Sequence, residues 1–557
     1  MFKKYIIKNS IKIKDFELKI NSFNIFLVIL ILLFILSVSY NLYWGSPYYF
    51  HPDERNIASS VSQLHLFNNF NPHFFAYGAF PIYSIYIVGL IVSFVSNPLA
   101  KNSFDVNFEQ AIIISRIFSS VFTTFTIFLI FKIARSIYNK LTASIALILS
   151  MTSVGYLQYS HFGTFEMWLS FFYLFLFYLL YLFLKERKLK FIVFASIVLG
   201  VAISIKISSI VLIMSPIIII LYASYKNGEL LEIINRSIKL TSTVIFFSSL
   251  TYLILNPYSL MDNASFIGAL TYESSVALGT LPVFYTGSFY DTNPILFQYA
   301  KILPFLINPV LTILSVPAIF FSIFAAIKKK NVYMILLITV FVIIFVSQSI
   351  LFVKWSRYIV PSISFLYIFI AVLLSRLKLL LPEKVWRTTL VIVFLISFIF
   401  SLSFVKTVRL TSDARVSAAT YAKENIERNS FVLSEVYDLG IIPFNQYFKS
   451  ITLFNFYELD GNPQKSQELQ ELLDETDYII LPSQRVLRSR ITNPALFPNG
   501  NKFYSNLSSG TLGFEKIYET PCDIFCRIVY LGNPIIIGEE TINIFDRPTV
   551  FIFKRSR

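Results

Sequence analysis

The sequence predicts an α-helical polytopic membrane protein with about eleven transmembrane helices and a C-terminal α/β domain outside the cytoplasm. Hydrophobic residues make up 55% of the 557 residues and charged residues only 14%, whereas a soluble protein has about a quarter of its residues charged. Apolar runs of about 17–25 residues, long enough to span a bilayer as helices, recur up to residue 406. From residue 407 to 557 the chain is mixed and polar, and no further run of that length occurs.

Twelve apolar runs begin near residues 24, 81, 111, 142, 167, 190, 208, 239, 305, 333, 358 and 388. The basic loops between them indicate which runs cross, because cytoplasmic loops are enriched in Lys and Arg. If the run at 80–96 crossed, "KERKLK" (185–190) and "KKK" (328–330) would face outward while the Lys-rich N-terminus faces inward. We therefore predict eleven spans, with 80–96 at the interface or packed within the protein. The predicted domains are a transmembrane domain, 1–406, with a long first outer loop at 45–110, and an extracytoplasmic domain, 407–557.

The net charge of +15 does not indicate a nucleic-acid-binding protein, because most basic residues lie in short loops between apolar runs, where they orient helices. The start, "MFKKYIIKNSIKIKDFELK", has no small-residue cleavage site and precedes an apolar run that is too long for a signal peptide. We therefore expect a retained cytoplasmic N-terminus in a multi-pass protein of the cell membrane.

The C-terminal region has the pattern of an α/β domain. "SDARVSAATYAKENI" predicts a helix with Ser412 as its N-cap, and "QKSQELQELLDET" predicts a second helix. "SFVLSEV", "DYIILPS" and "PTVFIFK" predict strands. We find no catalytic motif here and expect the domain to shape the acceptor side of a cleft. Cys522 and Cys526 are either a small disulfide outside the cytoplasm or two free thiols.

The predicted topology gathers the unusual polar residues of the membrane domain on its outer side. "HPDERN" (51–56) follows the first span, and Lys354 and Arg357 lie one helical turn apart on a shared face. The further members of this group are Arg116, His161, Glu166 and Lys206. Ionisable residues at such positions are costly to bury, so they are candidates for function.

This combination of charges suits one kind of reaction. Arg and Lys at the outer boundary of the membrane can hold a lipid phosphate or pyrophosphate. A nearby ionised carboxylate can act as general base for a hydroxyl acceptor. Together they favour sugar transfer from a lipid-phosphate donor to an extracytoplasmic hydroxyl, without a nucleotide.

At these residues the sequence resembles the polytopic GT-C glycosyltransferases, in particular the branch of protein O-mannosyltransferases and aminoarabinose transferases. The resemblance rests on an ordered set rather than on one specific motif. The set consists of "FHPDERNI", "IIISRIFSSVFTTFTIFLIFKIARSIY", "GVAISIKISSIVLIMSP", "LNPYSLMDNASF", "KWSRYIVPSISFL" and "GEETINIFDRPTVFIFKR", and it covers most of the chain.

The resemblance implies a role for several residues. Asp53 would be the catalytic carboxylate, with Glu54 beside it, and Glu166 would match the second acidic position. Arg116 would contact the lipid phosphate, and we assign Lys206, Lys354 and Arg357 to the same group of donor-phosphate-binding cations. Relatives often carry an Arg before the second acid, where this chain has Ser160 and His161. The resemblance also implies inversion, a polyprenyl-phosphate sugar donor, a protein, lipid or glycan acceptor, and no obligatory metal or other cofactor.

Other interpretations remain open from the sequence. Asp53 and Glu54 could be an acidic helix start after Pro52, which the helix dipole favours. Arg116, Lys206, Lys354 and Arg357 could be interfacial anchors whose charged ends reach toward water. An alternative function is transport or flipping of polyprenyl-linked glycans, although such a protein needs polar residues at midplane in several helices. Here the middle of most spans is Ile, Leu, Phe and Val.

Overall fold

Every one of the twelve apolar runs forms a helix in the computed structural model, which describes residues 12–13, 16–17, 22–96, 105–225, 230–535 and 538–556. In a bilayer only helices or closed barrels satisfy all backbone hydrogen bonds, which is why apolar runs of this length become helices. The helices of these runs are α1 (Ser22–Ser39), α3 (Ala79–Ser96), α4 (Phe108–Ile137), α5 (Lys140–Met151) with α6 (Val154–His161), α7 (Glu166–Glu186), α8 (Leu189–Ile205), η1 (Ile207–Ile213) with α9 (Met214–Tyr225), α10 (Leu230–Leu255), α14 (Pro309–Lys328), α15 (Val332–Ser349), α16 (Ser356–Leu377) and α17 (Glu383–Phe404) with η4 (Val405–Arg409).

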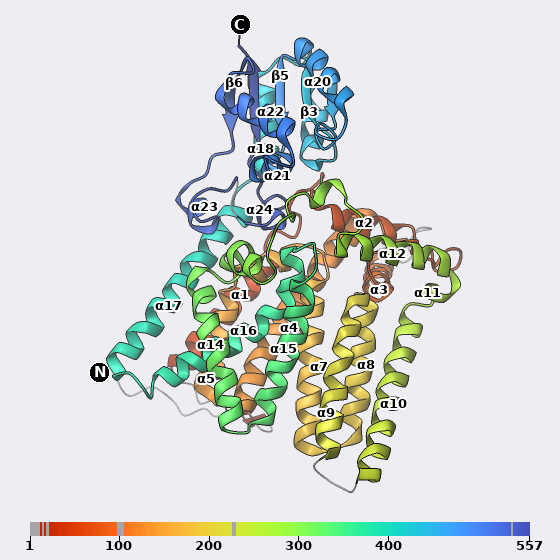
Figure 1. The fold of residues 1–557 in the computed structure, drawn as a ribbon, viewed down its shortest axis with the longest axis vertical. Helices are drawn as coiled ribbons and strands as arrows, with labels where there is room; N and C mark the ends of the chain where they lie inside the picture. Colours follow the sequence, from red (N-terminus) through yellow and green to blue (C-terminus); the bar gives the residue numbers. More distant parts are fainter. Residues whose placement is uncertain are drawn as a thin grey trace.

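The described helices confirm a multi-pass membrane protein. Nine of them are long and apolar enough to cross a membrane, and there are ten if α5 and α6, which meet at a 52° bend, are counted as one span. Two further apolar helices, Leu27–Ser39 and Leu189–Ile205, are shorter. Residues 79–96 pass the length test, but α3 packs against α2, α4 and α8, and Figure 1 shows it near the end of the bundle that carries the C-terminal domain. The predicted eleven spans and the orientation in the bilayer stay predictions.

Short elements cap this end of the bundle (Figure 1). In the first outer loop α2 (Pro52–Ser62) begins directly after His51, with Pro52 in its first turn. Proline suits that position, because its fixed φ is already helical and no N–H is lost to the helix. The other short elements of the membrane domain are α11 (Tyr258–Met261), α12 (Asn263–Leu278), η2 (Phe284–Thr286), η3 (Gln298–Ile302), α13 (Leu303–Leu306) and, near the N-terminus, the two-residue antiparallel strands β1 (Lys12–Ile13) and β2 (Phe16–Glu17).

The C-terminal region is an α/β domain, as predicted, with a five-stranded sheet in the order β4-β3-β5-β7-β6. Strands β4, β3 and β5 are parallel, and β7 pairs antiparallel with both β5 and β6. The first helix starts one residue later than expected, because Asp413 rather than Ser412 accepts a backbone N–H at its N-cap. The elements are α18 (Ala414–Asn425), β3 (Val432–Glu435), η5 (Leu439–Ile441), α19 (Ile442–Asn445), β4 (Ile451–Phe454), α20 (Pro463–Glu475), β5 (Tyr478–Leu481), α21 (Arg485–Thr492), α22 (Pro498–Ser509), β6 (Phe514–Glu519), α23 (Ile524–Val529), α24 (Glu540–Asn543) and β7 (Phe551–Arg555).

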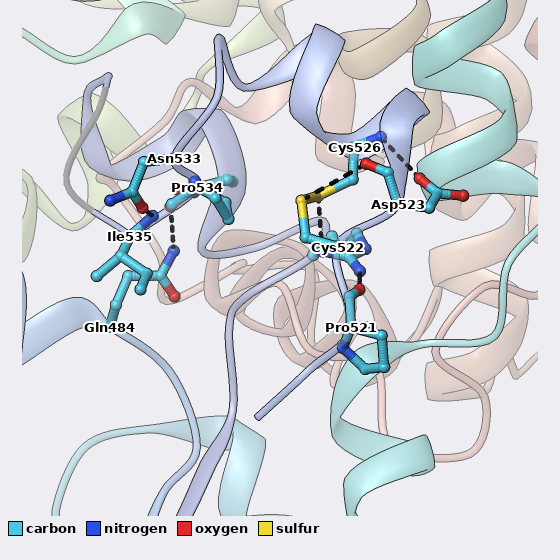
Figure 2. Close-up of a disulfide and its surroundings, with 10 residues drawn as sticks. Gln484, Pro521, Cys522, Asp523, Cys526, Asn533, Pro534 and Ile535 are labelled. Carbon is cyan, nitrogen blue, oxygen red and sulfur yellow. Dashed lines mark hydrogen bonds between the residues drawn. A yellow bond between two sulfur atoms is a disulfide. The ribbon is translucent and has the colours of Figure 1, made fainter. Parts of the chain in front are cut away.

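The segment between β6 and β7 returns to the membrane domain. Cys522 and Cys526 form a disulfide there, which decides between the two alternatives left by the sequence (Figure 2). The short helix α23 packs against α17, and its N-cap Asp523 accepts the N–H of Cys526 at 2.9 Å. Farther along, Gln158 of α6 donates to the carbonyls of Thr541 and Ile542 at 3.1 and 2.9 Å. This segment therefore fixes α24 against the top of the helical bundle.

Candidate active site

The acidic pair at the start of α2 points in two directions. Successive residues of an α-helix are about 100° apart, so neighbouring side chains meet different surroundings. Glu54 is buried against α4, while Asp53, with 21% of its side chain exposed, lines a cavity. Both acids also occupy the first helical turn, where the dipole favours negative charge, so the helix-start interpretation holds as well. The two carboxylates have different roles.

Glu54 and Arg116 form a buried clamp. Arg116 donates from Nε and Nη2 to the two Glu54 oxygens at 2.8 and 2.7 Å, and from Nη1 to the carbonyls of Leu42 and Trp44. Its side chain is 0% exposed. We expected Arg116 to contact a lipid phosphate, but its guanidinium has no face open to a ligand in this structure. The geometry favours positioning roles for Arg116 and Glu54.

The clamp also sets the start of α7. The Glu54 carboxylate accepts the backbone N–H of Gly163 at 2.5 Å. A side chain at Gly163 would collide with the hydroxyl of Ser115, so only glycine allows this close approach. Glu166, the first residue of α7, follows three positions later. The hydrogen bond from Gly163 to Glu54 therefore fixes the position of Glu166 relative to the Asp53–Glu54 pair.

Asp53 is held by two partners from distant parts of the chain. Its Oδ2 accepts from the Tyr77 hydroxyl at 3.2 Å and forms an ion pair with Arg357 in the first turn of α16. Burial raises the pKa of Asp53, but Arg357, together with His51 and the Tyr77 hydrogen bond, outweighs it, so the pKa lies below its ordinary value. Asp53 is thus ionised at neutral pH.

These residues border a cavity of about 430 Å³ between the end of the bundle and the C-terminal domain. Lys206, in the break between α8 and η1, lines it together with Arg357. The Lys206 ammonium lies 4.0 Å from the centre of the Tyr358 ring, and the Arg357 guanidinium lies 4.2 Å from that of Trp355. The ring faces attract these cations. Burial and the neighbouring Arg357 lower the pKa of Lys206 to about 8, so Lys206 is mostly charged at neutral pH. The cavity therefore has the Asp53 carboxylate and the cations Lys206 and Arg357 on neighbouring walls.

Glu166 lies beside this group. It lines a small pocket with Asp53, Arg357 and Thr541, and its Oε2 has no hydrogen-bond partner among the described residues. The neighbouring His161 is buried, 3.8 Å from Asp546 of the C-terminal segment. Ser160 and His161 thus lie where the C-terminal segment that contains Asp546 packs against the membrane domain.

Lys354 does not share a helical face with Arg357. Helix α16 begins only at Ser356, so Lys354 lies in the preceding extended segment. It is buried and donates to the carbonyl of Phe352 at 3.0 Å, and it is absent from the cavity lining. The prediction of a shared face is wrong, because it assumed that the helix began earlier.

The structure adds residues that the sequence did not single out. Tyr77, Glu273 of α12, and Arg485 and Glu540 of the C-terminal domain all line the cavity. Glu540 lies within the phrase "GEETINIFDRPTVFIFKR", to which the sequence assigned no role, and Arg485 and Tyr77 stand in no recognisable motif. Among the described residues no three His, Cys, Asp or Glu side chains come together as a metal-binding group.

Comparison with known proteins places this geometry in a fold class. Residues 104–255 match the family of dolichyl-phosphate-mannose-protein mannosyltransferases. No curated protein matches the sequence significantly. Two structures of the oligosaccharyltransferase of Archaeoglobus fulgidus are similar to this one, and both are 12% identical in sequence. The form with an inhibitory peptide and a dolichol-phosphate has a TM-score of 0.53 over 96% of this chain and 89% of that chain. The apo form has a TM-score of 0.51 over 95% and 88%.

A further similar structure, ArnT from Cupriavidus metallidurans bound to undecaprenyl phosphate, is 14% identical and has a TM-score of 0.46 over 86% of this chain and 94% of that chain. The archaeal structures extend the likeness over nearly the whole chain, and the family match covers α4 to α10. The protein therefore has the fold of the polytopic GT-C glycosyltransferases, and its residues 104–255 are similar to the dolichyl-phosphate-mannose-protein mannosyltransferases.

Proposed function

We propose that the protein is a membrane glycosyltransferase that transfers a sugar from a polyprenyl-phosphate donor to an extracytoplasmic acceptor hydroxyl with inversion. One observation carries the proposal. The ionised Asp53 and the cations Arg357 and Lys206 lie on neighbouring walls of the 430 Å³ cavity. A base for a hydroxyl and positive charge for a leaving phosphate are the two requirements of such a transfer.

The donor position follows from a groove that leaves the cavity between α7, η1, α15 and α16. Lys206, Arg357 and Tyr358 lie at the junction and line both spaces. Deeper in, the groove is lined by apolar side chains such as Leu169, Leu212 and Ile344. The groove has about 20 Å³ of free space, so a polyprenyl chain would enter it only if its walls move apart. Its phosphate would then lie at the two cations, where Arg357 can hold it bidentately.

The chemistry is a single displacement at the anomeric carbon. The acceptor hydroxyl oxygen attacks that carbon, its proton goes to Asp53, and the bond from carbon to phosphate oxygen breaks with its electron pair. Polyprenyl phosphate leaves, and Arg357 and Lys206 stabilise its charge. In this proposal the two cations do the work that a divalent metal does in other transferases.

Donor binding also prepares the base. In the unliganded site Arg357 pairs with Asp53 and lowers its pKa, which makes it a weak base. A phosphate that takes over part of the Arg357 guanidinium weakens this pairing, so the Asp53 pKa rises toward the value that proton abstraction at neutral pH requires. Glu166, next to this pair, would orient the acceptor hydroxyl.

The test is Asp53→Asn, which keeps the size of the side chain but removes the base. With radiolabelled polyprenyl-phosphate sugars and membrane acceptors, we expect transfer to fall by about 10²–10⁴-fold. Donor binding should be retained, since the cations are intact. Asp105→Asn is the matched control, because Asp105 is exposed in the same predicted outer loop and pairs with His65, away from the cavity lining. Near-normal transfer by Asp53→Asn would overturn the assignment of the base.

A further inference from the structure

The C-terminal sheet presents the carboxyl ends of its parallel strands to the membrane domain. Tyr457 follows β4 and Arg485 follows β5, and both line a side pocket. Phe284 and Tyr285 of η2 line its opposite wall. Ligands of parallel sheets characteristically bind outside the carboxyl ends of the strands. This pocket shares Phe284, Tyr285, Arg485 and Glu540 with the 430 Å³ cavity, so the two spaces adjoin.

The side pocket contains a buried arginine without an acidic partner. Arg488 is 4% exposed and lines the pocket one helical turn after Arg485. Its Nε donates to the Ile535 carbonyl at 3.2 Å and its Nη2 to Asn543 Oδ1 at 2.7 Å. Its Nη1 has no hydrogen-bond partner, and it forms no ion pair, among the described residues. A buried charge that is left unpaired is costly, so its retention points to a ligand.

No acid among the described residues forms an ion pair with Arg488, although Glu539 and Glu540 favour its charged form. Glu540 forms an ion pair with Arg485, with Nε and Oε1 2.6 Å apart. Glu435, at the end of β3, is buried and hydrogen-bonded to Tyr504 at 2.5 Å, and burial raises its pKa to about 8. It is therefore mostly protonated at neutral pH. Burial lowers the pKa of Arg488 to about 10, so Arg488 stays charged. The side pocket thus keeps a positive charge with which no carboxylate of the described residues pairs directly.

We propose that this side pocket is a subsite for an acidic group, a carboxylate or a phosphate, carried by the acceptor. The inference rests on the proposed function, because it places the reactive hydroxyl of the same acceptor in the adjoining cavity near Asp53. The pocket has about 10 Å³ of free space, which is room for about one water-sized group such as a single anionic oxygen. Arg488 Nη1 would donate to that oxygen, and the remainder of the acceptor would occupy the cavity.

The experiment separates this subsite from the donor phosphate position. Purified full-length protein is first saturated with undecaprenyl phosphate, and then titrated with glucuronate, glycerol 1-phosphate or glucose. The signal is tryptophan fluorescence, since Trp355 lines the cavity. We expect saturable binding of at least one acid and none of glucose. A preference for glucuronate would identify a carboxylate-bearing acceptor, and a preference for glycerol 1-phosphate a phosphate-bearing one.

Two variants then locate the binding. Arg488→Gln removes the charge, and Ser288→Asp adds a negative charge to the pocket wall without touching the Arg488 hydrogen bonds. Each should weaken acid binding by about tenfold or more, as loss of a hydrogen bond to a charged group does. Arg428→Gln, which changes an exposed arginine of the same domain, should bind as the wild type does.

Retained binding of undecaprenyl phosphate without saturable acid binding would overturn the subsite and leave the proposed function standing. Acid binding that is unchanged in both pocket variants would also overturn the subsite. Failure to bind undecaprenyl phosphate at all would instead count against the proposed function.

Discussion

Asp53 and Arg357 are 304 positions apart in the chain, yet they form the ion pair at the centre of the candidate site. Neither is fully buried, with 21% and 19% of their side chains exposed toward the cavity. Each can therefore reach a substrate, in contrast to Glu54 and Arg116 behind them. At the scale of single residues, access to the cavity separates groups that can react from groups that position others.

This pairing predicts a shift in pH dependence. Arg357 lowers the pKa of Asp53, so in the wild type the base stays ionised to low pH. In Arg357→Gln no guanidinium opposes the effect of burial, so the pKa of Asp53 rises. As the medium is acidified, the variant should therefore lose activity at a higher pH than the wild type does. The measurement is the acid limb of the kcat/KM profile, which reports the free enzyme. A uniformly lower profile with an unmoved limb would argue against the pairing.

At the scale of elements, the positions at which three helices begin determine which side chains meet at the site. The first turn of α2 carries both acids, the first turn of α16 carries Arg357, and α7 begins at Glu166. The Glu54–Arg116 clamp joins α2 to α4 and to the Gly163 backbone before α7. Because three elements depend on this pair, its loss should disturb the fold before it disturbs the chemistry.

We therefore expect Arg116→Met to destabilise the protein by about 3–5 kcal/mol, because Glu54 is left buried and uncompensated. The double variant Glu54→Gln/Arg116→Met should recover part of this loss, since it removes both charges together. Thermal unfolding of the detergent-solubilised protein measures the effect. If Arg116→Met raised only the donor KM and left the melting temperature unchanged, Arg116 would be a phosphate ligand after all.

In Figure 1 α2, α12 and the C-terminal domain lie at one end of the bundle, and the loop between α7 and α8 lies at the other. The cavity lies at the first of these ends, because residues of α2, α12 and the C-terminal domain line it. The structure shows which segments lie at the same end of the helical bundle. The orientation of the protein in the membrane is predicted from the basic loops. Acids and cations of the site share one face in either case.

Cysteine labelling tests that direction. In intact cells an impermeant thiol reagent should label Gln470→Cys and should not reach Lys188→Cys until the cells are lysed. Both positions are exposed, and the two native cysteines are already joined in a disulfide, which keeps the background low. Labelling at position 188 with protection at 470 would reverse the predicted orientation.

The sequence by itself determined the apolar helices, the strands β3, β5 and β7, and that the polar residues gather at one end of the membrane domain. These features are local, because each apolar run must satisfy its own backbone in the bilayer and the basic loops need only be counted. Only the tertiary structure decided which of two adjacent acids faces the cavity and that Arg116 lies behind that acid pair. It also decided that Arg485 borders the cavity and that Arg488 borders the adjoining side pocket. Those outcomes depend on the rotation of each helix about its axis and on where it begins, as Lys354 shows. Packing between segments hundreds of residues apart sets both, so no local pattern contains them.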